Sequence, residues 1–145
     1  MKSIYRIFLL ISVAGVLFYG AACSLLPTIG GDPLDGTSWI LMAYRKSKPL
    51  EGTTITAVFE DGQIHGSAGC NSYSAAYEVN GDKITISGPM AMTMMACMEP
   101  EGAMDQEQMY AGFLQDATSY QLSDEQLVIQ FTAHETLTFV PPMEH

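Results

Sequence analysis

The chain has 145 residues, of which 16 are Asp or Glu and 6 are Lys or Arg, so its formal net charge is −10 with neutral histidines. That length supports one domain with a single core. The acidic balance argues against nucleic acid as a partner, and against attachment to anionic lipid through surface charge.

Residues 1–22 have the order of an export signal peptide. Two basic residues precede an apolar run over residues 7–18, and small residues then precede Cys23. Those small residues resemble the lipobox of bacterial lipoproteins, which implies that Cys23 is acylated and becomes the mature N-terminus. Residues 23–33 contain two Pro and two Gly and are interpreted as a lipid-anchored tether. We therefore expect a membrane-anchored protein of the cell envelope that faces outside the cytoplasm. Cleavage by a general signal peptidase and an uncleaved anchor are the alternatives.

The three cysteines are an odd number for an exported chain. Lipidation of Cys23 would leave Cys70 and Cys97, which could pair in an oxidising compartment. Two buried free thiols are the alternative.

The folded part opens near Leu34 with a strand in which Trp39 and Leu41 alternate with Ile40 and Met42. Both faces of this strand are apolar, which predicts a strand that is buried on both sides.

Turn signals divide the next stretch into two hairpins. Asp61-Gly62 is typical of a two-residue hairpin turn, and Asn80-Gly81-Asp82 marks the second turn. The strands are expected at 54–60 with 63–67, and at 73–79 with 83–87.

One helix is expected over residues 104–117. β-branched residues are absent between residues 98 and 117, while Met109, Phe113 and Leu114 recur at helical spacing. Three strands are expected after it, at 120–122, 127–132 and 136–140. The order predicts the α+β class, with a small antiparallel β-sheet or partly closed β-barrel of about seven or eight strands and one helix packed on it.

Three segments carry a resemblance to a known family. They are Leu34-Asp35-Gly36-Thr37-Ser38-Trp39, then Gly66-Ser67-Ala68-Gly69-Cys70-Asn71-Ser72-Tyr73 with Tyr77 beyond it, and Met92-Thr93-Met94-Met95-Ala96-Cys97. On these motifs, residues 34–141 resemble the META domain, the HslJ-like family of small exported lipoproteins. Met94 departs from the pattern, because the family often has Arg there. The resemblance implies a compact β-rich domain with an envelope-stress or surface-interaction role and no settled enzymatic activity.

The residues offer little support for catalysis. His65, His134 and His145 are not spaced as a ligand pair or a triad, and a thiolate pair of Cys70 with His65 competes with the disulfide. We therefore expect no enzymatic activity, no catalytic residue and no cofactor.

A ligand surface, if present, is expected at Asn71, Tyr73, Tyr77 and Thr93, which combine polar ends with apolar bodies. The alternative for Asn71 is that its side chain satisfies the backbone of a turn.

The methionine-rich segment gives a second hypothesis. Met92, Met94 and Met95 with Cys97 could hold Cu(I), since soft sulfur ligands select that ion, whereas methionine is also a flexible core filler. The leading hypothesis is a monomeric, non-enzymatic, stress-related envelope lipoprotein domain that binds a protein or another envelope component and has no metal site.

Overall fold

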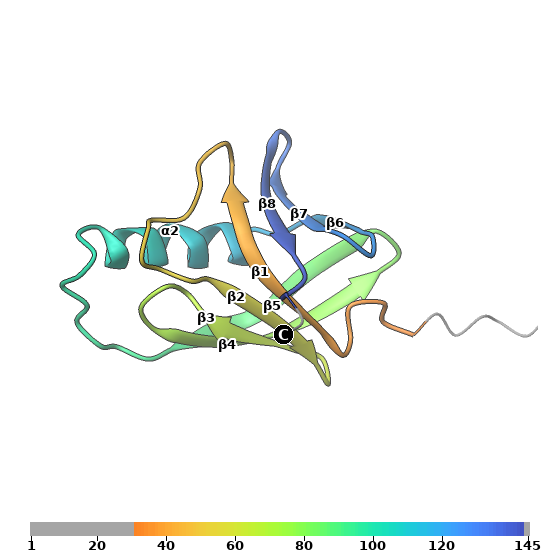
Figure 1. Cartoon of the computed structure of the whole chain (residues 1–145). Helices are drawn as coiled ribbons and strands as arrows, with labels where there is room; N and C mark the ends of the chain where they lie inside the picture. Colours follow the sequence, from red (N-terminus) through yellow and green to blue (C-terminus); the bar gives the residue numbers. More distant parts are fainter. Residues whose placement is uncertain (1–30, 144–145) are drawn as a thin grey trace, which may run out of the picture. The chain divides into compact units, whose positions relative to one another are not determined.

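The computed structural model describes residues 31–143, which form eight β-strands and one helix, α2, around a single core (Figure 1). The strands are β1 (Thr37–Tyr44), β2 (Thr56–Glu60), β3 (Gln63–Ser67), β4 (Ser72–Asn80), β5 (Lys83–Met92), β6 (Ser119–Leu122), β7 (Leu127–Thr132) and β8 (Glu135–Val140), and the helix is Ala103–Gln115. Each strand is antiparallel to its neighbours, and β1 pairs with β8, so the strands close into a ring. The predicted α+β class is confirmed. The expected signal peptide, Cys23 and most of the expected tether lie outside the described residues.

The hairpin between β2 and β3 turns at Asp61-Gly62, as its sequence predicts. Both residues have positive φ angles, 50° for Asp61 and 73° for Gly62. Two successive positive φ angles define the turn whose twist matches that of antiparallel strands.

Strand β5 is longer than the sequence predicts, because it continues past Ser87 to Met92. The pairing with β4 shifts between the pair Ser74 with Ala91 and the pair Ala76 with Ser87. The extra β5 residues include Pro89, which has no backbone N–H and is tolerated in such an irregular stretch. This irregular pairing, a β-bulge, lets β5 continue through Gly88-Pro89, a dipeptide that usually marks the end of a strand.

The expectation that β1 is buried on both sides is wrong. Trp39 and Leu41 point into the core with 5% and 3% exposure, whereas Met42 on the opposite face is 47% exposed. The pairing of β1 with β8 shifts between Leu41 and Ala43, which brings Tyr44 opposite the core residue Leu137. Tyr44 packs against the core and contacts Phe113 of α2 with ring centroids 6.3 Å apart.

Helix α2 packs against β5 near the weakest junction of the ring. β5 and β6 share a single residue pair, Lys83 with Ser119. Gln115 of α2 donates hydrogen bonds of 3.3 Å to the carbonyls of Ile86 and Gly88, so the helix satisfies β5 backbone groups that no strand pairs.

The buried stripe of α2 differs from the predicted one. The helix buries Ala103, Gln106, Glu107, Tyr110 and Leu114, which recur at helical spacing, whereas Met109 is 44% exposed. Of the apolar positions in the predicted pattern, Leu114 is buried and Phe113 packs against the core, so Met109 is the one that departs from it. The polar side chains of Gln106 and Glu107 complete the inner face. Among residues 31–143, no helix has the length and apolar character needed to cross a membrane.

Candidate functional site

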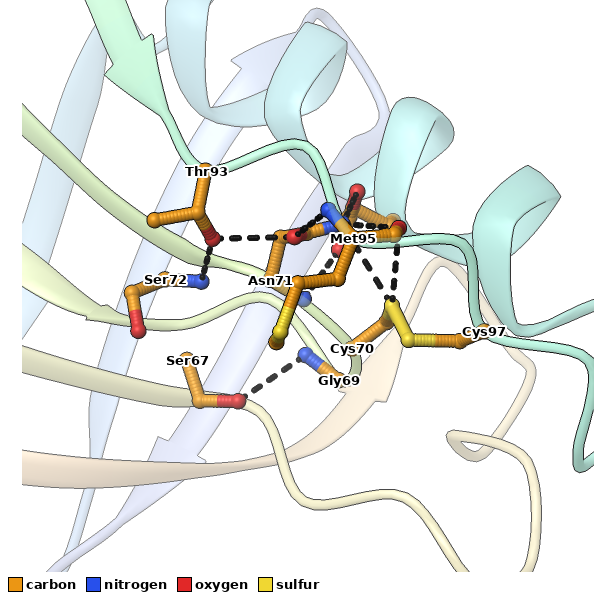
Figure 2. Close-up of a disulfide and its surroundings, with 9 residues drawn as sticks. Ser67, Gly69, Cys70, Asn71, Ser72, Thr93, Met95 and Cys97 are labelled. Carbon is orange, nitrogen blue, oxygen red and sulfur yellow. Dashed lines mark hydrogen bonds between the residues drawn. A yellow bond between two sulfur atoms is a disulfide. The ribbon is translucent and has the colours of Figure 1, made fainter.

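Cys70 and Cys97 form a disulfide that joins the turn after β3 to the segment between β5 and α2 (Figure 2). Their Cα atoms lie 6.1 Å apart, and the bond spans 27 positions of sequence. The predicted pairing is confirmed, and the proposed thiolate pair with His65 is excluded because a disulfide sulfur is not a thiolate.

Asn71 connects three segments of the chain. Its side-chain amide donates hydrogen bonds to the Met95 carbonyl at 3.2 Å and to Glu107 Oε1 at 2.9 Å. Its side-chain carbonyl accepts hydrogen bonds from Thr93 Oγ1 at 2.9 Å and from the Met95 amide at 2.7 Å (Figure 2). Asn71 is 1% exposed. It therefore fixes the segment after β5 to both the β3–β4 turn and the helix.

Glu107 and Gln106 are the buried polar partners that the sequence analysis missed. Glu107 is 6% exposed, and its second oxygen accepts the Asn71 backbone N–H at 2.5 Å. Gln106 accepts the Leu50 N–H at 2.6 Å and donates to Thr53 Oγ1 at 2.9 Å. Their spacing from Tyr110 was a usable signal, because positions three and four residues before a buried helical residue share its face.

Of the four residues expected to form a ligand surface, Thr93 alone is exposed. Asn71, Tyr73 and Tyr77 are buried, with every side-chain polar group bonded inside the domain. Tyr73 donates to the Thr56 carbonyl at 2.9 Å and shares a 2.8 Å hydrogen bond with Tyr110, while Tyr77 donates to Asp32. The structure thus brings Asn71 and Thr93 together and places the tyrosines in the interior.

The tyrosine hydroxyls are strongly perturbed by burial. Desolvation raises the pKa of Tyr73 and of Tyr110 well above the ordinary value of 10.0. Desolvation, followed by the hydrogen bond and charge of Asp32, also raises the pKa of Tyr77. These groups stay protonated at neutral pH, so they act as hydrogen-bonding core residues.

A groove of about 760 Å³ lies beside the Asn71 network. One wall is the end of β5 and the segment after it, and the other is α2. The lining residues are Asn71, Met90, Met92, Thr93, Met94, Met95, Ala96, Met104, Asp105, Glu107, Gln108 and Ala111. Its volume is in the range of about 300 to 1,000 Å³ that is common for small-molecule sites.

Methionine dominates the groove. On the helix, Met104, Gln108 and Ala111 form a stripe at spacings of four and three residues, on a different face from Tyr110 and Leu114. Met94 is 96% and Met95 58% exposed. An exposed cluster of flexible thioether side chains is the composition that adaptable binding surfaces use.

The groove contains three of the four residues of the copper hypothesis, Met92, Met94 and Met95. Cys97, the fourth, is in the disulfide and offers no thiolate ligand. Within residues 31–143, no cluster of three His, Cys, Asp or Glu side chains is arranged to hold a metal ion.

The described part of the chain is thus a small β-rich domain whose single helix and longest strand frame a methionine-lined groove. Residues 32–144 match the META domain profile. The chain belongs to the META domain family, which confirms the resemblance inferred from its motifs.

Three solved structures are similar to this chain. An NMR structure of a protein from Burkholderia xenovorans is 28% identical with a TM-score of 0.63, and the match covers 77% of this chain and 85% of that one. A second NMR structure is 24% identical with a TM-score of 0.59, covering 74% and 91%. A crystal structure of a DUF4847 family protein from Bacteroides vulgatus is 11% identical with a TM-score of 0.55, covering 78% and 97%. The last two likenesses concern the fold alone. A comparison with curated proteins gives no match.

Proposed function

We propose that this protein is a non-enzymatic, stress-related lipoprotein domain of the cell envelope that binds an apolar segment of another envelope component in the methionine-lined groove. The observation that carries the proposal is that the walls of the groove combine exposed methionines with a rigid support. Met94 and Met95 are exposed, while the Asn71 hydrogen bonds and the Cys70–Cys97 disulfide hold the segment that bears them.

This combination suits binding, because it lowers the entropy lost when a ligand binds while leaving the contact atoms adaptable. The backbone of the wall is positioned before any partner arrives, and only methionine side chains must be ordered. An enzyme would need a nucleophile, a base or a tuned carboxylate in the groove. The groove is lined by two carboxylates. Asp105 lies on the exposed side of the helix, and both oxygens of Glu107 accept hydrogen bonds from Asn71.

The proposed placement in the envelope rests on the sequence. A lipid on Cys23 would hold the monomeric domain at a membrane surface, where its groove meets other envelope proteins. Mass spectrometry of the membrane fraction tests this part. A mature chain that starts at Cys23 with acyl mass supports it, and an intact Met1 or a non-acylated terminus contradicts it.

Capture from native membranes tests the groove. Ala111→Trp would fill the groove, since Ala111 lines its helical wall. Ala133→Trp makes the same change in the exposed β7–β8 turn and is the matched control. We expect the intact lipidated protein and the control to capture the same partner and Ala111→Trp to lose it. Equal capture by all three would contradict the proposal.

Copper binding is the second candidate, because Met92, Met94 and Met95 line one groove. Titration with Cu(I) under anaerobic conditions separates the candidates. Tight uptake that is lost in the Met94→Leu, Met95→Leu double variant favours copper, since leucine keeps the apolar surface and removes the sulfur. Partner capture that survives these substitutions favours the binding module.

A further inference from the structure

Beyond its methionines, the groove has a charge of one sign. Asp105 and Glu107 are the acidic residues that line it, on the helical wall. Glu99 and Glu101 are exposed in the segment between the lining residues Ala96 and Met104. Among the described residues, none of those lining the groove is Lys, Arg or His. The sequence has no Lys or Arg after Lys83, so the strand end, the connecting segment and the helix that form the groove carry no basic residue beyond that position.

The basic residues of the domain are elsewhere or engaged. Arg45 forms an ion pair of 3.0 Å with Glu135 and lies 4.7 Å from the centre of the Phe113 ring. Lys46 and Lys48 follow it in the β1–β2 connection, outside the lining of the groove, and Lys83 pairs with Asp82 at 3.9 Å. The acidic groups near the groove are therefore not neutralised by a basic side chain among those that line it.

We propose that the occupant of the groove is a cationic amphipathic segment of a partner protein, with apolar side chains that contact the methionines and Lys or Arg side chains that face Glu99, Glu101 and Asp105. This inference rests on the proposed binding function and names the chemistry of the partner. An apolar groove with an acidic margin is complementary to a segment that has one apolar face and one basic face, and charge of the opposite sign also speeds encounter.

The same electrostatics disfavour other segments. An acidic amphipathic segment would meet three carboxylates and a domain whose described residues carry 15 acidic and 4 basic side chains, a net charge of −11 with neutral histidines. Like charges near one another cost binding free energy, so the groove discriminates by repulsion as well as by attraction.

Three synthetic peptides test the proposal. Each has roughly 16 residues, about four helical turns, with the same leucine face. The opposite face carries Lys in the first peptide, Gln in the second and Glu in the third. The intact lipidated protein is held in zwitterionic-lipid nanodiscs, and empty discs provide the reference for peptide that binds lipid.

We expect the Leu/Lys peptide to bind on the order of tenfold more tightly than the Leu/Gln peptide at low salt, since each of the three exposed carboxylates contributes up to about fivefold. The advantage should shrink as salt shortens the range of the interaction. The Leu/Glu peptide should bind most weakly.

Charge-neutralising variants locate the effect. Glu101→Gln with Asp105→Asn should remove most of the advantage of the Leu/Lys peptide. Asp124→Asn with Glu125→Gln makes the same change of charge in the β6–β7 turn, at the opposite end of the domain in Figure 1, and should leave most of it.

Each other outcome overturns a distinct statement. Equal binding of the Leu/Lys and Leu/Gln peptides would refute the cationic preference and leave the groove function standing, provided that Ala111→Trp abolishes both. An equal loss in the two charge variants would show that the whole domain, not the groove, attracts the peptide. Binding that survives Ala111→Trp would refute the groove as the binding site. If no peptide binds, the proposal that the partner presents a cationic segment is refuted, and capture from membranes then tests the binding function separately.

Discussion

Asn71→Ala should destabilise the domain far more than an ordinary surface substitution. The change deletes five side-chain hydrogen bonds, a weak one to Cys70 Sγ and four stronger ones to Thr93, to Glu107 and to both backbone groups of Met95. Of the four stronger bonds, three are neutral and worth about 1 kcal/mol each, and the one to the carboxylate is worth about 2 kcal/mol. Water can reach Thr93 and Met95, which are exposed, so we expect a net loss of about 3 to 4 kcal/mol.

The assay is urea unfolding together with thermal unfolding. A loss of this size corresponds to roughly 10 to 15 °C in melting temperature for a domain of this length. Asn80→Ala is the control, because Asn80 is exposed at the end of β4 and should change stability by less than about 1 kcal/mol. Equal effects of the two substitutions would refute the assignment of Asn71 as the link between the three segments.

A double-mutant cycle adds a second check. Glu107→Gln leaves one acceptor for two donors of Asn71, so it should cost about 2 kcal/mol. Combined with Asn71→Ala, the two losses should sum to more than the double variant shows, because both remove the same contact. Strict additivity would indicate that the two side chains do not interact.

Three further changes have definite expected results. Cys70→Ser and Cys97→Ser should each cost about 3.5 kcal/mol, from the 27-position span, and the double variant should add little; thermal unfolding with and without reductant checks this. Gly66→Ala should destabilise the domain by about 2 to 4 kcal/mol, because the added Cβ would lie 2.2 Å from the Thr56 carbonyl oxygen. Gly112→Ala, where the added Cβ meets open space on α2, should stabilise it by up to about 1 kcal/mol. Urea unfolding measures both changes, and a change of the same sign in the two variants would contradict this account. Burial raises the pKa of Tyr110 above its ordinary value of 10.0. The contribution of Tyr110 to stability should therefore be constant below pH 10 and fall above it, because the unfolded chain releases the proton first. Tyr110→Phe should reduce the slope of stability against pH in alkaline solution.

The sequence was a good guide where local geometry decides the structure. The Asp61-Gly62 turn was predictable because few residues adopt two successive positive φ angles, and the strands on either side followed from it. The sequence left two alternatives for Cys70 and Cys97, a disulfide and two buried free thiols, and the structure has the disulfide. The family motifs covered the turn after β3 and the segment after β5, which the structure shows in contact.

Long-range contacts decided what the sequence could not reveal. The inner face of α2 includes Gln106 and Glu107, whose hydrogen-bond partners are more than 30 positions away in the chain, so the periodicity of apolar residues located only part of that face. The groove was not predictable for the same reason, because contacts between distant parts of the chain form it. Met92 and Met104 come from different elements, and nothing in the spacing of methionines tells whether they fill a core or line an exposed surface.

Site-specific photo-cross-linking in native membranes tests the central claim most directly. A photoreactive residue replaces Met94 in the groove in one variant and Met42, an exposed methionine on the outer face of β1, in the other. The account predicts a discrete cross-linked product at position 94 that is absent at position 42 and lost when Ala111→Trp is added. A product of equal yield at both positions, or one that persists with the groove filled, would contradict the account.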